Sequence, residues 1–290
     1  MDMNLQKYIA FAKTAECGSF TRAAEMLNYS QSGVSRMIGD LEKEWRLALL
    51  ERGRGGVRLT SDGMKLLPLV QSVCGECRKL QSRVDELNGL QSGVLRIGAF
   101  SSVATHWLPK IVKEFQRDYP NIEYEFFMGD YAEIERLIAE GRVDCGFVRL
   151  PTLPEFDTVF LERDRLLAVL PEDHPLAGSE PFPVKALCDY PLILFERGTG
   201  SEMSEIFEEH GIRPDVHFTV WDDYAIMSMV ESGLGIGILP ALILRRAPYR
   251  IAVKELDIPV CRRIGIAMRD RKSAPLAARR FLDYLRYRND

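Results

Sequence analysis

Hydroxyl, amide and guanidinium side chains cluster in residues 30–36, which read SQSGVSR. Glutamine can pair with adenine, arginine can bind guanine or a phosphate, and serine can bond to either. No acidic side chain interrupts this stretch. Arg52, Arg54 and Arg58 follow around a Gly-rich turn and add the positive charge that binds a phosphate backbone. The pattern favours a surface that reads DNA; the alternative is a solvated polar helix face, which is common on any helix.

Two short helices, over residues 20–27 and from Ser30 to about Leu41, are predicted to position these side chains. Apolar residues recur at helical spacing in both segments and mark their buried faces. Ser19 or Thr21 can cap the first helix, and Ser30 can cap the second. The exposed face of the second helix then carries the polar residues Gln31, Ser32, Ser35 and Arg36. The following segment, ERGRGGVRLT, is typical of a small hairpin, or wing.

A long helix is predicted from Ser61 to about Leu90. Its apolar residues follow a 4-3 rhythm typical of a coiled-coil seam: Leu66, Val70, Val73, Cys77, Leu80, Val84 and Leu87. Such a seam needs a partner helix, so the pattern favours a dimer; the alternative is a helix that lies on its own domain. Pro68 fits poorly in a continuous helix and is expected to bend it near its start.

Strands and helices alternate after residue 93, which is typical of parallel sheets covered on both faces. The predicted strands are 94–100, 122–128, 143–150, 165–171, 191–195, 216–220, 235–239 and 263–269. The predicted helices are 104–118, 130–140, 202–210, 224–233 and 274–287. These elements form two sets of similar size, so we expect an α/β multidomain chain whose larger part has two lobes with a cleft between them.

Three places in this larger part have the chemistry of a small-anion site. Ser101 and Ser102 follow the first strand where a helix begins, and free N–H groups with the helix dipole attract an anion there. The segment RGTGS places Thr199 and Ser201 at a similar junction in the second lobe. Arg149 ends a strand at the carboxyl edge, where open α/β sheets bind ligands. Together they predict a small anion such as a carboxylate, although each alone is explained by helix capping.

Other motifs carry no chemistry of their own. The glycines of GLGIG at 233–237 follow a helix and enter a strand, the reverse of a dinucleotide-binding order. The pair CGEC at 74–77 has no second Cys or His pair nearby, so core thiols are the better interpretation. The enzyme motifs Ser-x-x-Lys, Gly-x-Ser-x-Gly and His-Glu-x-x-His and the phosphate-binding P-loop do not occur in the sequence. We therefore expect no catalytic residues, no metal site and no cofactor.

Charge is unevenly distributed along the 290 residues. The net charge is −4, but residues 1–90 carry about +2 and the remainder about −6. This asymmetry fits two parts with different partners. No apolar run approaches the ~20 residues of a membrane span, and no signal-peptide core opens the chain. With six scattered cysteines, read as reduced thiols, these features predict a protein of the cytoplasm with no membrane partner.

The quoted segments resemble the LysR-type transcriptional regulators. The residues that follow the family pattern in the winged helix-turn-helix are Ala23-Ala24, Leu27, Ser30-Gln31-Ser32, Val34-Ser35, Leu41-Glu42, Arg52 and Leu59-Thr60. GVLRIGAF, IAEGRVDCGFV, LPEDHPLA and MVESGLGIGILP resemble its effector domain. The resemblance implies a DNA-binding domain over 1–60, a dimerising linker helix over 61–92, and an effector domain over 93–290 similar to type 2 periplasmic binding proteins. Lobe I would span about 93–163 and 268–290, and lobe II about 164–267, with chain crossings near 163 and 267.

The resemblance also implies partners and contact residues. It implies double-stranded DNA, a small effector, expected here to be anionic, and a homodimer or homotetramer, with RNA polymerase as a candidate further partner. The expected DNA-contacting residues are Arg22, Ser30, Gln31, Ser32, Ser35, Arg36, Arg52, Arg54 and Arg58. The expected effector-binding residues are Ser101, Ser102, Arg149, Thr199 and Ser201. The rival hypotheses are a small-molecule binding protein without specific DNA binding, and an enzyme on the α/β lobes.

Two positions depart from the family pattern; one of them is Leu50, where the family often has Phe. Arg46 stands where the family usually has Gly, at the end of the third helix. A left-handed turn there costs a non-glycine residue ~1 kcal/mol. Arg46 either bears that strain, contacts a phosphate, or changes the geometry of the wing.

Overall fold

A computed structural model describes residues 4–53, 56–87, 92–195 and 202–289. The predicted site residues Arg54, Thr199 and Ser201 lie outside the described residues. By contacts, the chain divides into two units: Met1–Gly89 with Ala139–Arg142, and Leu90–Ile138 with Val143–Asp290. Across the described residues, no helix is both long and apolar enough to cross a bilayer.

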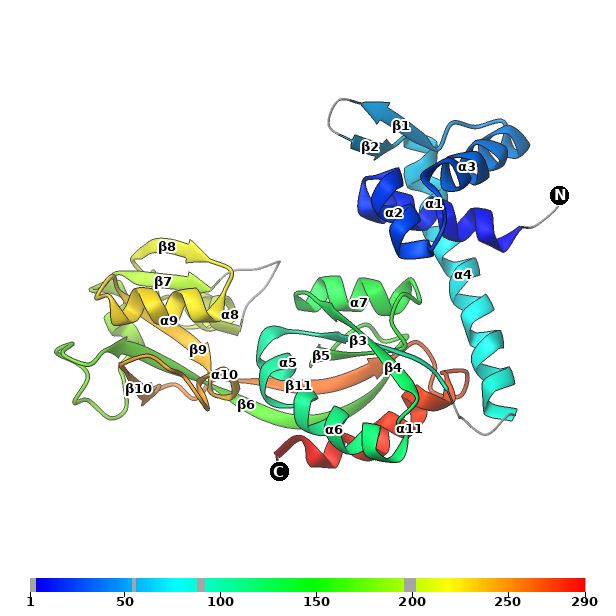
Figure 1. The fold of residues 1–290 in the computed structure, drawn as a ribbon. Coiled ribbons are helices and arrows are strands. Elements are labelled where there is room, and N and C mark those ends of the chain that lie inside the picture. The colour runs from blue at the N-terminus through cyan, green and yellow to red at the C-terminus, as the bar shows by residue number, and fades with distance from the viewer. Residues whose placement is uncertain (1–3, 54–55, 88–91, 196–201, 290) are drawn as a thin grey trace. The chain divides into compact units, whose positions relative to one another are not determined.

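The first unit is a helical domain with a two-stranded wing (Figure 1). Its elements are α1 (Leu5–Cys17), α2 (Phe20–Leu27), α3 (Gln31–Trp45), β1 (Leu50–Gly53), β2 (Gly56–Leu59) and α4 (Ser61–Leu87). The two predicted helices and the wing are present. Val34, Ile38 and Leu41 of α3 are at most 1% exposed and pack with Phe11 of α1, so hydrophobic burial fixes which face of α3 looks inward.

Local side-chain chemistry sets where these helices begin. Ser19 Oγ accepts a hydrogen bond from the Arg22 N–H at 3.4 Å, so Ser19 caps α2. Ser30 Oγ accepts from the Gly33 N–H at 3.0 Å and caps α3, as predicted. These two caps set where α2 and α3 begin, and α2 ends at Asn28, which is in the left-handed conformation.

The wing is held tightly against the start of α4. Thr60 Oγ1 donates to the Ala48 carbonyl at 2.6 Å and accepts from the Gly63 N–H at 2.9 Å. A Cβ at Gly63 would lie 2.2 Å from the Leu49 carbonyl oxygen, so only glycine permits this approach. The base of the wing therefore has a fixed position relative to α4.

Helix α4 packs on the first unit through only part of its apolar seam. Val70 and Cys74 are buried in the core that α1 and α3 form. Further along, Val73, Leu80 and Val84 are 40%, 68% and 42% exposed. The first half of the seam thus matches the alternative interpretation, a helix lying on its own domain, while the second half leaves apolar side chains uncovered.

The second unit is built on a nine-stranded mixed sheet in the order β4-β3-β5-β11-β6-β9-β7-β8, with β10 paired to β6. Its strands are β3 (Gly93–Ala99), β4 (Ile122–Met128), β5 (Cys145–Leu150), β6 (Asp157–Pro171), β7 (Leu192–Phe195), β8 (Val216–Val220), β9 (Ile236–Pro240), β10 (Ile251–Glu255) and β11 (Cys261–Met268). Strand β3 is parallel to β4 and β5, and β7 is parallel to β8 and β9. We call the part around β3–β5 lobe I and the part around β7–β9 lobe II.

Two long strands join the lobes. Strand β6 pairs with β11 as far as Arg165 and with β9 from Leu166 onward. The return occurs between β10, which pairs with β6, and β11, which pairs with β5 of lobe I from Arg263. The first crossing lies where β6 changes partner, between residues 165 and 166. The return lies a few residues before 267, because the whole of β11 already belongs to the lobe I sheet.

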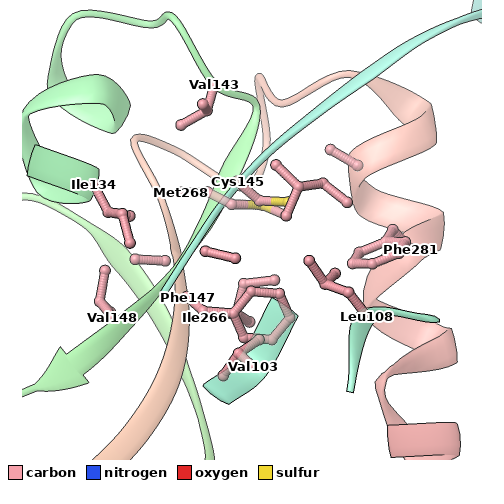
Figure 2. Packing of buried hydrophobic residues seen from close by; sticks show 14 of the residues in the cluster. Val103, Leu108, Ile134, Val143, Cys145, Phe147, Val148, Ile266, Met268 and Phe281 are labelled. Carbon is pink, nitrogen blue, oxygen red and sulfur yellow. The ribbon is translucent and has the colours of Figure 1, made fainter. Parts of the chain in front are cut away.

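Helices cover both faces of lobe I (Figure 1). They are α5 (Ser101–His106), α6 (Leu108–Asp118), α7 (Tyr131–Ala139) and α11 (Leu276–Tyr284), and η2 (Leu285–Asn289) ends the described chain. Figure 2 shows the core between them, where Val103, Phe147, Ile266 and Phe281 meet. The single helix expected over 104–118 is two helices separated at Trp107, because Pro109 has no N–H and cannot continue the α5 hydrogen-bond ladder.

Lobe II is smaller and has two apolar clusters on its sheet. Its helical elements are η1 (Val184–Cys188), α8 (Glu202–Glu209), α9 (Asp223–Glu231) and α10 (Ala241–Leu244). Asp222 caps α9 by accepting a hydrogen bond from the Ala225 N–H at 2.8 Å. This cap places Asp223 at the first helical position, just after the carboxyl end of β8.

Candidate functional site

The predicted reading face of α3 is solvent-accessible and free of acidic groups. Gln31, Ser32 and Arg36 are exposed and Ser35 is partly buried, while Val34 on the opposite side is fully buried. A helix fixed through its apolar face in this way presents the N-terminal polar face to a partner. Helix N-terminal residues are the ones that contact base edges in helix-turn-helix proteins.

Other predicted contacts lie around this face with different local roles. Ser30 is exposed, but its Oγ already accepts the capping N–H and lies 3.1 Å from the Ser32 Oγ. Arg22 is exposed on α2 and Arg58 on β2. Arg52 lies on β1 opposite Val57 in the hairpin register. Ser30 is therefore first a helix cap, and the exposed side chains of Arg22 and Arg58 can bring positive charge to a phosphate.

Two carboxylates at the far end of α3, Glu42 and Glu44, are engaged within the first unit. Glu42 Oε1 accepts hydrogen bonds from the backbone N–H groups of Leu49 and Leu50, at 2.7 and 3.1 Å. Glu44 forms an ion pair with Lys7 of α1. These two acidic groups fasten α3 to the wing and to α1, which limits the negative charge that they present to a polyanion.

Arg46 occupies the left-handed conformation that the sequence makes costly. Its φ and ψ are 56° and 36°, and its N–H closes the end of α3 by donating to the carbonyl groups of Glu42 and Lys43. The chain thus makes the left-handed turn at the end of α3 without a glycine. The side chain is exposed and its charge is free to act at the surface.

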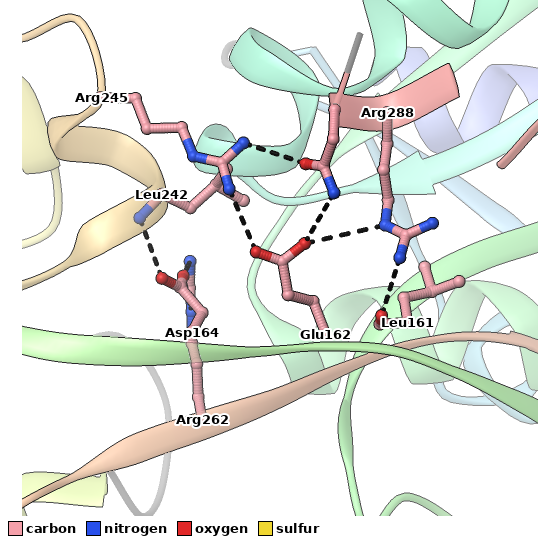
Figure 3. Close-up of polar contacts among 8 residues, drawn as sticks. Leu161, Glu162, Asp164, Leu242, Arg245, Arg262 and Arg288 are labelled. Atoms are coloured by element: carbon pink, nitrogen blue, oxygen red, sulfur yellow. Dashed lines mark hydrogen bonds and ion pairs between the residues drawn. The ribbon is translucent and has the colours of Figure 1, made fainter. Parts of the chain in front are cut away.

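In the second unit, a buried ion pair joins the two crossing strands. Arg262 of β11 donates from Nε and Nη2 to Asp164 Oδ2 of β6, at 2.9 and 2.7 Å. Both side chains are less than 10% exposed. The other oxygen, Asp164 Oδ1, accepts from the Leu242 N–H at the start of α10, at 2.9 Å (Figure 3). Each charge is thus paired and hydrogen-bonded, as a buried ion pair requires.

The same guanidinium reaches into lobe I. Arg262 Nη2 donates to Ser102 Oγ at 2.6 Å and Nη1 donates to the Tyr131 hydroxyl at 2.9 Å. Its carbon lies 4.9 Å from the Phe100 ring centroid. Burial disfavours the charge of Arg262, but contacts with Tyr131 and Asp164 outweigh that effect and raise its pKa above the ordinary value. Predicted site residue Ser102 is thus 2% exposed and is held by Arg262.

Asp223 is a buried carboxylate beside this cluster. Its residue is 6% exposed, and burial raises the pKa of its carboxyl to about 6, partly opposed by the charge of Arg262. Asp222 and Asp164 add to the rise. Within the stretches that the structure describes, no other residue donates a hydrogen bond to this carboxylate. A buried acidic group with so little compensation is typical of a functional site.

The other predicted effector residues that the structure describes, Ser101 and Arg149, have different surroundings. Ser101 is exposed at the start of α5, next to Ser102. Arg149, at the end of β5, has its Nη2 3.6 Å from Glu205 Oε1 on α8, so the pair links lobe I to lobe II. Ser102 is therefore hydrogen-bonded to Arg262, whereas Arg149 forms an ion pair with Glu205.

Sequence reasoning missed the residues that organise this region. Arg262, Asp164, Tyr131 and Asp223 carried no motif, and the partners of the central ion pair are 98 residues apart. One signal was present: Arg262 and Asp164 lie in short charged runs next to apolar stretches of two strands. Charges in such strands are rarely buried unless they are paired.

Comparison with known proteins agrees with both units. The helix-turn-helix model of the bacterial regulatory lysR family matches residues 5–64, and the LysR substrate binding domain model matches residues 88–290. The probable HTH-type transcriptional regulator LrrA of Synechococcus elongatus is 35% identical over 289 residues, which cover 98% of this chain and 97% of that protein.

Solved structures show the same architecture. A full-length OxyR variant from Pseudomonas aeruginosa is 25% identical, with a TM-score of 0.72 over 98% of this chain and 94% of that one. The regulatory domain of CcmR from Synechocystis PCC6803, solved with 2-PG, is 26% identical, with a TM-score of 0.62 over 67% of this chain and 96% of that one. The chain thus belongs to the LysR family and is a DNA-binding transcriptional regulator with a two-lobed effector-binding domain.

Proposed function

We propose that α3 reads the DNA sequence through Gln31, Ser32, Ser35 and Arg36, and that Arg22 and the wing arginines Arg52, Arg54 and Arg58 bind phosphates, with Ser30 contributing its hydroxyl. The observation that carries this proposal is the exposed, acid-free face of α3 opposite a fully buried Val34. Base contacts confer specificity and phosphate contacts confer affinity. The regulator would act in the cytoplasm, where a bacterial chromosome is reached, and would communicate with RNA polymerase there.

Fluorescence anisotropy on the gene's own upstream DNA tests this assignment. Arg36→Ala removes a predicted contact, while Lys43→Ala removes an exposed positive charge from the far end of the same helix. We expect Arg36→Ala to weaken specific binding by about ten- to a hundredfold and Lys43→Ala to change it little. Equal binding by wild type and Arg36→Ala would reject α3 as the reading helix.

The exposed second half of the α4 seam supports a homodimer. Val73, Leu80 and Val84 recur at spacings that keep them along one side of a helix, and all three are exposed. An apolar row of this kind is normally covered by a partner helix. We therefore propose that α4 pairs with α4 of a second copy, which places two reading helices on one DNA site, and that two such dimers can form a tetramer.

For the effector, we propose a small anion bound between the lobes. Ser101 offers an exposed hydroxyl, Ser102 an oriented one, and Arg149 a positive charge near the lobe II helix α8. Thr199 and Ser201 would add hydroxyl groups from lobe II. The related CcmR domain holds 2-PG, which supports a small ligand for this domain type.

A thermal-shift screen of small carboxylates tests the effector proposal. A stabilising compound should lose its effect in Arg149→Ala and keep it in Arg250→Ala, a control that removes an exposed cation of lobe II. A stabilising compound that is insensitive to Arg149→Ala would remove Arg149 from the site. The rival hypothesis, a small-molecule binding protein without specific DNA binding, predicts ligand hits together with no preference for the upstream DNA.

A further inference from the structure

Lobe I contains a hollow of about 450 Å³ where β6 begins and β11 ends. It is lined by Asp157, Thr158, Val159, Ile266, Met268, Arg271, Lys272, Arg279 and Leu282. Asp157 and Met268 face each other in the β6–β11 register. The ion pair of Arg262 and Asp164 lies toward the other end of the same ladder, so this hollow is separate from the region between the lobes.

The hollow has an apolar floor and a cationic rim. Val159, Ile266, Met268 and Leu282 belong to or pack against the lobe I core. Among the residues that line the hollow, Arg271, Lys272 and Arg279 are basic and Asp157 is acidic; Asp270, on the same loop, adds a second carboxylate beside Lys272. This excess of positive charge stands out in a part of the chain whose net charge is negative. An anion with an apolar body satisfies both surfaces at once.

Two carboxylates hold the backbone of the loop that forms the rim. Asp157 Oδ2 accepts a hydrogen bond from the Arg271 N–H at 2.7 Å, and Asp270 Oδ1 accepts from the Lys272 N–H at 2.9 Å. Both carboxylates thereby hold the loop that carries the two cations. Among the described residues, neither the Arg271 nor the Lys272 side chain forms an ion pair. The backbone that carries the two cations is therefore held in place, and their exposed side chains are available to a ligand.

We propose that this hollow is a second ligand site, for a small monocarboxylate with an alkyl or aromatic body. The carboxylate would lie at Arg271 and Lys272, and the apolar body would cover Leu282 and Val159. The volume falls within the ~300–1,000 Å³ typical of small-molecule sites. The proposal does not depend on the effector site between the lobes. The site has both an apolar and a cationic surface. We therefore expect neither a simple anion nor a neutral alkane derivative to bind well.

Isothermal titration of the full-length protein with acetate, butanoate, hexanoate and octanoate at constant ionic strength tests the proposal. Each methylene that reaches the floor should tighten binding about two- to fourfold, up to the value for full burial. Hexylammonium should not bind. Equal affinities across the series, or tighter binding of hexylammonium, would overturn the proposal.

Two matched double variants locate the site. Arg271→Gln with Lys272→Gln should weaken octanoate about tenfold, near the loss expected for two exposed charge contacts. Arg280→Gln with Arg286→Gln removes the same charge from the neighbouring helical segment, outside the hollow, and should leave the affinity unchanged. An equal loss in both doubles, or a loss seen only in Ser102→Ala, would place the ligand elsewhere and reject this site.

Discussion

Asp223 leads to a prediction of unusual sign: its removal should stabilise the protein at neutral pH. The structure leaves this residue only 6% exposed, and burial raises the pKa of its carboxyl from 3.8 to about 6. A group with a raised pKa binds its proton more tightly in the folded state. The folded state is therefore favoured at low pH, and that advantage is lost as the pH rises through about 6.

The size of the pKa shift gives the expected change in the free energy of unfolding. A rise of about two pKa units corresponds to ~3 kcal/mol of unfavourable free energy once the carboxylate is ionised. Asp223→Asn keeps the shape and removes the charge, so it should raise the unfolding free energy at pH 7.5 by about 2–3 kcal/mol. The gain should fall to about half of that at pH 5, where the wild-type carboxyl is largely protonated.

Urea unfolding followed by tryptophan fluorescence measures this difference. Trp107 is fully buried in lobe I and reports on the second unit. Asp222→Asn is the matched control, because it removes the adjacent carboxylate while asparagine can keep the α9 cap. The control should shift stability by less than ~0.5 kcal/mol. A destabilised Asp223→Asn variant, or a gain that does not change between pH 7.5 and pH 5, would refute the reasoning.

Three further predictions test other parts of the structure. Arg262→Met leaves Asp164 buried without its counter-charge and should lower the unfolding free energy in urea by ~3–5 kcal/mol; a loss below ~1 kcal/mol would show that water enters the pair. Arg46→Gly relieves the left-handed strain at the end of α3 and should stabilise the first unit by ~1 kcal/mol in thermal unfolding; no gain would mean that the Arg46 side chain compensates. Leu80→Glu with Val84→Glu places charge on the exposed α4 seam and should dissociate the proposed dimer in sedimentation velocity; an unchanged mass would reject α4 pairing.

The first unit could be predicted largely from its sequence because its signals are local. Ser19 and Ser30 act as helix caps within three residues of their partners, and the inward faces of α2 and α3 follow from helical spacing. Arg46 could even be singled out as a strained position before its φ of 56° was seen. Local chemistry decides all of these features, so no knowledge of distant contacts is needed.

The alternation of strands and helices in the second unit could be predicted from the sequence. The strands that join the two lobes could not. The first half of β6 and all of β10 were missed, because their antiparallel partners are distant in sequence and residues 162–165 are all charged. The Arg262–Asp164 pair exists only once β6 and β11 are aligned. Of the expected ligand residues, Ser102 lies in this cluster. The Arg262 guanidinium that orients it comes from β11, one of the two strands that join the lobes.

Specific and non-specific DNA affinity, measured for wild type and Gln31→Ala over a range of salt concentrations, tests the central claim most directly. Gln31 is exposed and uncharged, so its removal leaves the phosphate-binding charge unchanged. If α3 reads bases, Gln31→Ala should reduce the ratio of specific to non-specific affinity by about ten- to a hundredfold with the same salt dependence. An unchanged ratio, or an equal loss on both DNAs, would contradict the account.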